Sequence, residues 1–119
     1  MNENQFYQMQ KMSIPRLVEN KEMRDTVVDW SVKSDRQTFA EMYCDFSNVD
    51  LRQKITNIKC PSLILLESYF KNIKPAIESQ YKNLKTGNLQ YADKGLHFIM
   101  YDDKEWYFDQ LENFLTIKE

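Results

Sequence analysis

The chain is short of several residue types, and each shortage excludes a class of protein. Only two of its 119 residues are cysteine and only one is histidine. Cys44 and Cys60 form neither a C-x-x-C pair nor a disulfide framework, and a single histidine does not make up a Cys/His zinc site. We therefore expect no metal, no cofactor and no disulfide. Both thiols are predicted to be buried small residues, which favours a reducing compartment.

Long hydrophobic runs are also missing. The longest, Leu63–Leu66, is far shorter than the roughly 20 apolar residues that a transmembrane helix needs. The N-terminus does not have the basic and then apolar pattern of a signal peptide. These absences predict a soluble chain that has no membrane partner and resides in the cytoplasm.

Charge of one sign is not in excess. The 16 Lys and Arg residues are interleaved with 18 Asp and Glu residues, giving a net charge of −2. A nucleic-acid-binding domain normally carries a basic patch or stripe, so this balance predicts no nucleic-acid partner. An apolar content of 42% with 29% charged residues is ordinary for a globular protein.

Residues 1–49 contain no glycine, and their apolar residues recur at helical spacing in three stretches. We therefore predict two or three short amphipathic helices here, with Pro15 near a boundary or a kink. Ser34 to Gln37 predicts a capping box at the start of the third helix, in which the Ser34 side chain accepts from the Gln37 amide. The apolar positions are Phe6, Met9, Ile14, Leu17 and Val18, then Met23, Val27 and Trp30, then Phe39, Met42, Tyr43 and Phe46.

Residues 50–119 have a different pattern. After Pro61, the apolar run from Ser62 to Leu66 predicts a strand that is covered on both faces. A helix is expected over 72–84, ended by Gly87 as a left-handed cap, and a second strand over 88–92. The order strand, helix, strand, helix implies parallel strands with a right-handed crossover.

A last helix is expected after His97. Asp102 to Glu105 predicts its capping box, and its buried stripe is expected to comprise Tyr107, Leu111, Phe114 and Leu115. The only histidine therefore lies between a strand and a helix. A loop at that place in an open α/β sheet often carries catalytic groups.

Two parallel strands and their helices cannot cover both faces of the run Leu63–Leu66, because parallel sheets occur buried inside larger layered folds. Three explanations are open. The chain is a fragment of a longer protein, which we favour, or it pairs with a second copy through an open sheet edge, or its first helices fold over that edge.

The order of these elements resembles the C-terminal end of the α/β-hydrolase superfamily. The resemblance covers Asp50 to Phe114, with Ile58-Lys59-Cys60-Pro61 leading into the strand. The segment from His97 to Asp103, followed by Glu105-Trp106, looks like a variant found in bacterial members. The helices before it resemble the cap over the substrate pocket. The resemblance implies an incomplete α/β-hydrolase-like fold, with cap helices in 1–49 and core elements in 50–119.

The resemblance also implies roles for individual residues. His97 would be the general base that takes a proton from a serine nucleophile and returns it to the leaving group of a small acyl substrate, such as an ester. Glu67 would be the triad acid, because Phe70 stands where the family usually has aspartate. Trp30, Tyr69 and Phe70 would bind substrate. The plainer alternatives are a partly buried His97 bonded to backbone and a solvated Glu67 at a strand end.

The chain departs from the family in what it lacks. It has no G-x-S-x-G nucleophile elbow and no glycine-rich oxyanion loop, and Leu96 precedes the histidine where glycine is usual. We therefore expect no hydrolysis by this chain alone. Two other functions remain open: a non-catalytic remnant that acts as an oligomeric binding module, and an unrelated small α/β domain in which His97 is structural.

Overall fold

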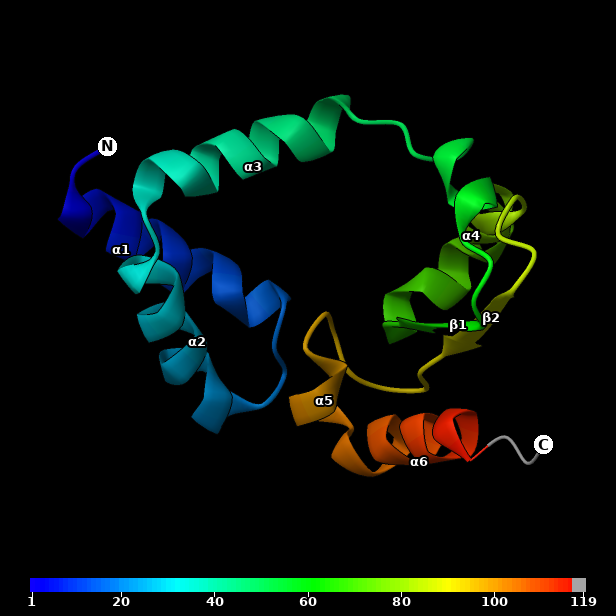
Figure 1. Cartoon of the computed structure of the whole chain (residues 1–119). Coiled ribbons are helices and arrows are strands. Elements are labelled where there is room, and N and C mark those ends of the chain that lie inside the picture. The colour runs from blue at the N-terminus through cyan, green and yellow to red at the C-terminus, as the bar shows by residue number, and fades with distance from the viewer. Residues whose placement is uncertain (117–119) are drawn as a thin grey trace. The chain divides into compact units, whose positions relative to one another are not determined.

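The computed structural model of the chain describes residues 1–116, and Figure 1 labels its helices and strands. The chain divides into two compact units, Met1–Asp50 and a second unit that begins at Leu51. Each unit is described by itself below. Within the described range, every helix is too short or too polar to cross a bilayer.

The first unit contains three helices, where the apolar spacing predicts two or three. They are α1 (Glu3–Ser13), α2 (Lys21–Lys33) and α3 (Arg36–Asn48), with a short 3-10 turn at Ile14–Arg16 after α1. Asn2 and Gln5 form a capping box at the start of α1. The Asn20 side chain caps α2 by accepting from the backbone N–H groups of Glu22 and Met23.

The N-cap of α3 is Asp35 and not Ser34, so the predicted capping box is wrong by one residue. The Asp35 carboxylate accepts from the Thr38 backbone N–H at 2.9 Å and from the Thr38 hydroxyl at 2.8 Å. Ser34 instead ends α2 and donates from its hydroxyl to the Trp30 carbonyl at 3.3 Å. The Gln37 side chain donates to Glu41. Two donors from one residue explain why Asp35 takes the cap position.

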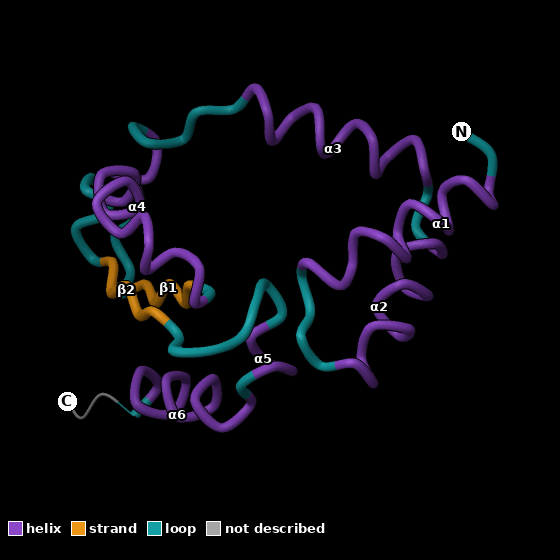
Figure 2. The backbone as a smooth tube through the Cα atoms, turned by 180° about the vertical axis from the view of Figure 1, so that it is seen from behind, coloured by secondary structure: helices purple, strands orange, loops and turns teal. Residues whose placement is uncertain are grey.

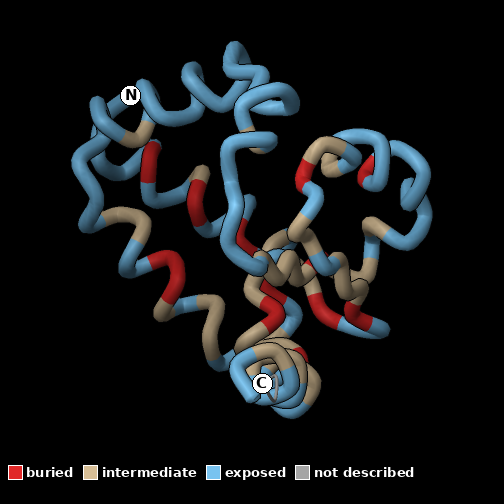
Figure 3. The backbone as a smooth tube through the Cα atoms, turned by 45° about the vertical axis from the view of Figure 1, so that its right-hand side comes forward, coloured by how far each residue is buried: buried red, intermediate tan, exposed pale blue. Residues whose placement is uncertain are grey.

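The core of the first unit lies between α1, the 3-10 turn and α2. Its buried side chains are Phe6, Gln10, Ile14, Val18, Val27 and Val28. Helix α3 contributes no buried residue, and Figure 3 shows it as exposed along almost all of its length. Tyr43 and Phe46 on the predicted apolar face are 57% and 66% exposed. The face that the spacing predicts is present, but most of it is uncovered.

The second unit is a mixed α/β arrangement around two strands, β1 (Ser62–Leu66) and β2 (Gly87–Tyr91). They pair in parallel, with Ser62 opposite Gly87 and Leu66 opposite Tyr91, which confirms the predicted parallel pair. Figure 2 shows the two strands side by side. The other elements are 3-10 turns at Lys54–Asn57 and Ser68–Ile73, and helices α4 (Lys74–Tyr81), α5 (Ile99–Asp102) and α6 (Lys104–Leu115).

Strand β1 is less covered than its composition predicts. Leu66 is buried, but the four residues before it are only half-buried. A continuous apolar run is typical of a strand that is buried on both faces. The described part of the chain therefore leaves much of this strand accessible.

Several local predictions in the second unit are wrong. Gly87 is not a left-handed cap: within 1–116 the only positive φ is that of Gly95, at 91°, and Gly87 begins β2. Asp103 precedes α6 without a side-chain cap bond, so the second capping box is absent. Leu115 is 76% exposed and not part of a buried stripe. Cys44 and Cys60 are both exposed, because each lies on a segment that nothing in its own unit covers.

Candidate active site

The loops that follow β1 and β2 are bonded to each other. Parallel strands end at the same edge of a sheet, where open α/β folds place their functional groups. The backbone N–H and the hydroxyl of Ser68 both donate to the Gly95 carbonyl, at 3.2 and 2.8 Å. The Ala92 N–H donates to the Leu66 carbonyl at 2.9 Å. The bonds from Ser68 join it to Gly95. Glu67 directly precedes Ser68, and His97 lies two residues after Gly95.

An ion pair adds a second bridge between the same two loops. The Lys71 ammonium donates to the Asp93 carboxylate. This hydrogen bond, with the charge of Lys71, lowers the pKa of Asp93. Both side chains are accessible to solvent, so the pair helps to orient the loops more than it stabilises them.

Asp102 holds the beginning of the histidine loop. Its carboxylate accepts from the Leu96 N–H at 2.9 Å. Gly95 is buried with a positive φ, and a Cβ there would lie 2.9 Å from the Asp102 Cβ. The sequence predicted Asp102 as a helix-start residue, and this role was missed because a bond across six residues follows no helical or strand period.

His97 itself is exposed and lies in a turn just before α5. Its ring contacts Phe98 edge-on, with centroids 5.6 Å apart at 78°. Within residues 1–116 its imidazole has no hydrogen-bond or ion-pair partner. The partly buried, backbone-bonded histidine that was the alternative interpretation is not what the structure has.

Glu67 follows β1 and is half-buried. Its carbonyl accepts from the Phe70 N–H at 3.1 Å, while its carboxylate bonds to no other residue in the described range. Glu67 and His97 are thus on neighbouring loops but are not hydrogen-bonded to each other. An acid–base pair in working geometry is therefore not assembled by these residues alone.

The three predicted substrate-binding residues separate into two groups. Tyr69 and Phe70 lie in the turn directly after Glu67, with ring centroids 6.1 Å apart, and Tyr69 is 56% exposed. Trp30 lies on α2 of the other unit. The loops after β1 and β2 therefore carry Glu67, Tyr69, Phe70 and His97, whereas Trp30 belongs to the first unit.

Two buried hydroxyl groups near the sheet have no partner among the described residues. They are Thr86 Oγ1 and the Tyr91 hydroxyl. Burial raises the pKa of the Tyr91 phenol, and the Lys74 ammonium lies 5.3 Å from the centre of its ring. Buried polar atoms are nearly always hydrogen-bonded. Both hydroxyl groups beside the strand pair could therefore accept or donate a further hydrogen bond.

The described residues offer no acidic, histidine or cysteine group of three or more that could hold a metal ion. No family model, curated protein or solved structure matches this chain. The functional interpretation therefore depends on the residues at the strand edge and on their chemistry.

Proposed function

We propose that the second unit is the C-terminal part of a serine α/β-hydrolase, with His97 as the general base and a small acyl compound such as an ester as the substrate. The observation that supports this most directly is the pair of hydrogen bonds from Ser68 to the Gly95 carbonyl. They hold the loop after β1 against the loop after β2. These are the loops that carry the acid and the histidine in the superfamily that the sequence resembles.

The proposed chemistry uses the His97 imidazole, which has no hydrogen-bond partner in the described residues, as proton acceptor and donor. One ring nitrogen of His97 takes the proton from a serine hydroxyl as that oxygen attacks the acyl carbon, and returns it to the leaving alkoxide. The other ring nitrogen donates to a carboxylate, which holds the ring in the productive orientation. Glu67 is the candidate for this acid. It is half-buried and adjacent to Ser68, and its carboxylate makes no hydrogen bond to another described residue.

The nucleophile must come from residues outside this sequence, because the chain has no G-x-S-x-G motif. Two observations support further sheet beside the strand pair. Strand β1 is only half-buried over Ser62 to Leu65 although its sequence is typical of a central strand. The buried Tyr91 hydroxyl also lacks a partner in the described part of the chain.

In this proposal the helices of residues 1–49 form the cap over the substrate pocket, and Trp30, Tyr69 and Phe70 contact the acyl substrate. The alternative is a non-catalytic module that pairs with a second copy through its open sheet edge. The same half-buried strand supports that alternative, since an uncovered strand is a template for pairing. The two functions differ in whether a reactive serine is present.

The reading frame that precedes the Met1 codon is the first place to look for the nucleophile. We expect it to encode a G-x-S-x-G motif. We also expect a fluorophosphonate probe to label that serine in the polypeptide isolated from its source. H97N should abolish labelling, whereas D109N, an exposed change on α6, should leave it intact. A frame without a nucleophile motif, together with a defined dimer of this chain, would contradict the hydrolase proposal and support the binding module.

A further inference from the structure

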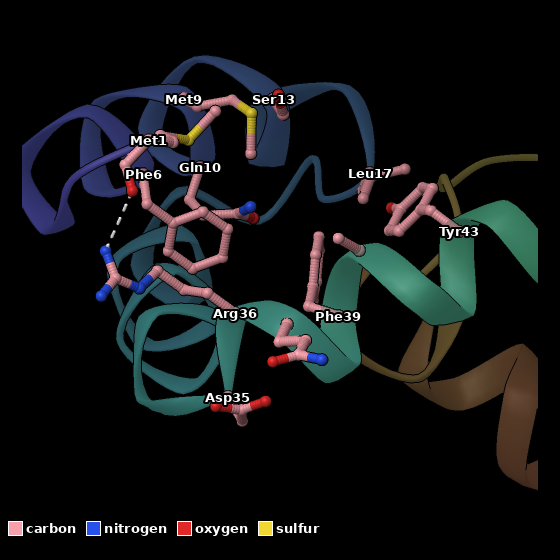
Figure 4. Close-up of a pocket in the computed structure, with 12 residues that line it drawn as sticks. Met1, Phe6, Met9, Gln10, Ser13, Leu17, Asp35, Arg36, Phe39 and Tyr43 are labelled. Atoms are coloured by element: carbon pink, nitrogen blue, oxygen red, sulfur yellow. Dashed lines mark hydrogen bonds between the residues drawn. The ribbon is translucent and has the colours of Figure 1, made fainter.

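A cavity of about 760 Å³ lies within the first unit, between α1 and α3. Figure 4 shows the side chains that surround it. Phe6 and Met9 come from α1, and Phe39 and Tyr43 come from α3. The volume is within the range of about 300–1,000 Å³ that small-molecule pockets occupy.

Aromatic rings line one side of this cavity. Phe6 and Phe39 meet edge-to-face, with centroids 5.5 Å apart, and Phe39 lies 4.9 Å from Tyr43. Leu17, which follows α1, adds an aliphatic surface. Rings and aliphatic chains of this kind bind apolar ligand surface, and their mutual contacts hold the wall in place.

One buried polar group interrupts the apolar lining. Gln10 is only 4% exposed and lines the cavity. Its side-chain amide bonds to no other residue in the range 1–116. Figure 4 shows this amide among the lining side chains, beside the ring of Phe6. Neither polar atom of this amide is among the fully buried atoms without a partner, which in the described residues are Thr86 Oγ1 and the Tyr91 hydroxyl. The amide is therefore accessible from the cavity and can bond to a ligand there.

Charge at the cavity is balanced and lies at one end. Arg36 donates to the Met1 carbonyl at 3.2 Å, and the neighbouring Asp35 caps α3. The lining side chains therefore include one cation and one anion, and the one lining residue that is both polar and buried, Gln10, is neutral. This arrangement favours a neutral ligand over a fatty carboxylate.

We propose that this cavity binds a neutral aliphatic acyl compound, an amide or an ester, whose carbonyl oxygen accepts a hydrogen bond from the Gln10 amide nitrogen. The aliphatic chain lies against Phe6, Leu17, Phe39 and Tyr43. The proposal depends only on residues 1–50 and does not require the hydrolase function of the second unit. It assigns the one buried polar group of the helical unit to ligand binding.

The test uses octanamide as the probe and the whole chain as the protein. Titration followed by ¹H–¹⁵N NMR is expected to give saturable shifts at Gln10, Phe39 and Tyr43. Q10L should weaken octanamide binding about threefold to tenfold, since it removes one hydrogen bond. Q8L, a matched change at an exposed glutamine on the same helix, should leave the affinity unchanged.

Thermal melting separates ligand binding from a structural role of Gln10. Because the amide bonds to no other described residue, Q10L is expected to leave the melting temperature of the free chain nearly unchanged while it weakens binding. Three results would overturn the proposal: no saturable shifts with a folded chain, equal affinity in Q10L, or a markedly lower melting temperature in Q10L. If the NMR shifts of the cavity residues change with protein concentration in the absence of octanamide, the occupant of the cavity is a second copy of the chain and the proposal is wrong.

Discussion

The Asp102 carboxylate accepts the Leu96 N–H at 2.9 Å and so ties the residue before His97 to the end of α5. This bond sets the direction in which the chain enters the histidine turn. It also explains why a buried glycine with positive φ stands directly before it, since the Asp102 side chain occupies the space of a Cβ at position 95.

Replacing Asp102 is therefore expected to loosen the histidine loop. In D102A the free energy of local opening at the Leu96 amide should fall by about 1–3 kcal/mol, because a hydrogen bond to a charged acceptor is lost. Native-state hydrogen exchange at Leu96 measures this. D102N keeps an acceptor oxygen without the charge and should retain part of the protection, while equal exchange in D102A and the unaltered chain would refute the role.

Gly95 is expected to tolerate alanine poorly. Its φ of 91° disfavours an L side chain, and the new Cβ would lie 2.9 Å from the Asp102 Cβ. We expect G95A to destabilise the second unit by about 2 kcal/mol or more. Urea unfolding followed by Trp106 fluorescence in a W30F background reports on that unit.

Gly87 provides the matched control for Gly95. Its φ is not positive, so alanine there carries no backbone strain of the kind expected at Gly95, although an added Cβ would lie 2.8 Å from Leu84 Cδ2, 2.9 Å from Leu84 Cγ and 3.2 Å from the Leu84 carbonyl oxygen. G87A should therefore cost less than G95A. A larger loss in G87A would show that the conformation of Gly95 does not limit the stability of the loop.

Asp35 makes the stability of α3 dependent on pH. The Thr38 backbone N–H and hydroxyl lower the pKa of this carboxyl below 3.8. A lowered pKa means that the ionised cap stabilises the helix fully above pH 3.8, and that this contribution is lost as the pH falls through the lowered value. Circular dichroism at 222 nm should show partial helix loss in that window.

The variant D35N is the control for this titration. Asparagine caps a helix about as well as aspartate but does not ionise. Its helix content should stay closer to constant over the same pH range, whereas D35A should have a frayed α3 at every pH. An identical acid transition in D35N would assign the titration to another carboxylate.

Both cysteines are expected to react quickly in the folded chain. The structure leaves Cys44 on α3 and Cys60 before β1 exposed. Reaction with an aromatic disulfide reagent should release two equivalents of the reagent's thiolate per chain. The rate should be within about tenfold of the rate measured for the urea-unfolded chain. Protection of either thiol in the native chain would indicate a covering segment or a partner over its surface.

Periodicity in the sequence was enough to predict the helices of the first unit and the parallel strand pair. Apolar residues at helical spacing and the continuous run Ser62–Leu66 reflect local preferences that the folded chain keeps. The position of His97 after a strand and before a helix follows from chain order, whereas the candidate acid Glu67 came from the resemblance to the α/β-hydrolase superfamily. Their neighbouring positions then follow from the parallel register.

Cap positions and loop contacts could not be predicted in the same way. Ser34 and Asp35 are both good N-cap residues, and the Thr38 hydroxyl decided between them. The bond from Asp102 to Leu96 and the bonds from Ser68 to Gly95 join residues whose separation follows no period. The cavity beside Gln10 depends on how α3 lies against α1, which helical spacing does not specify.

The measurement that tests the central claim most directly is the rate of ester hydrolysis by the source polypeptide that contains this chain, with and without His97. With p-nitrophenyl butyrate, we expect H97N to lower kcat about 10⁴-fold or more, as removal of a triad base does. D109N should leave kcat unchanged. If H97N and the unaltered protein hydrolyse the ester equally fast, His97 is not the general base and the hydrolase assignment is wrong.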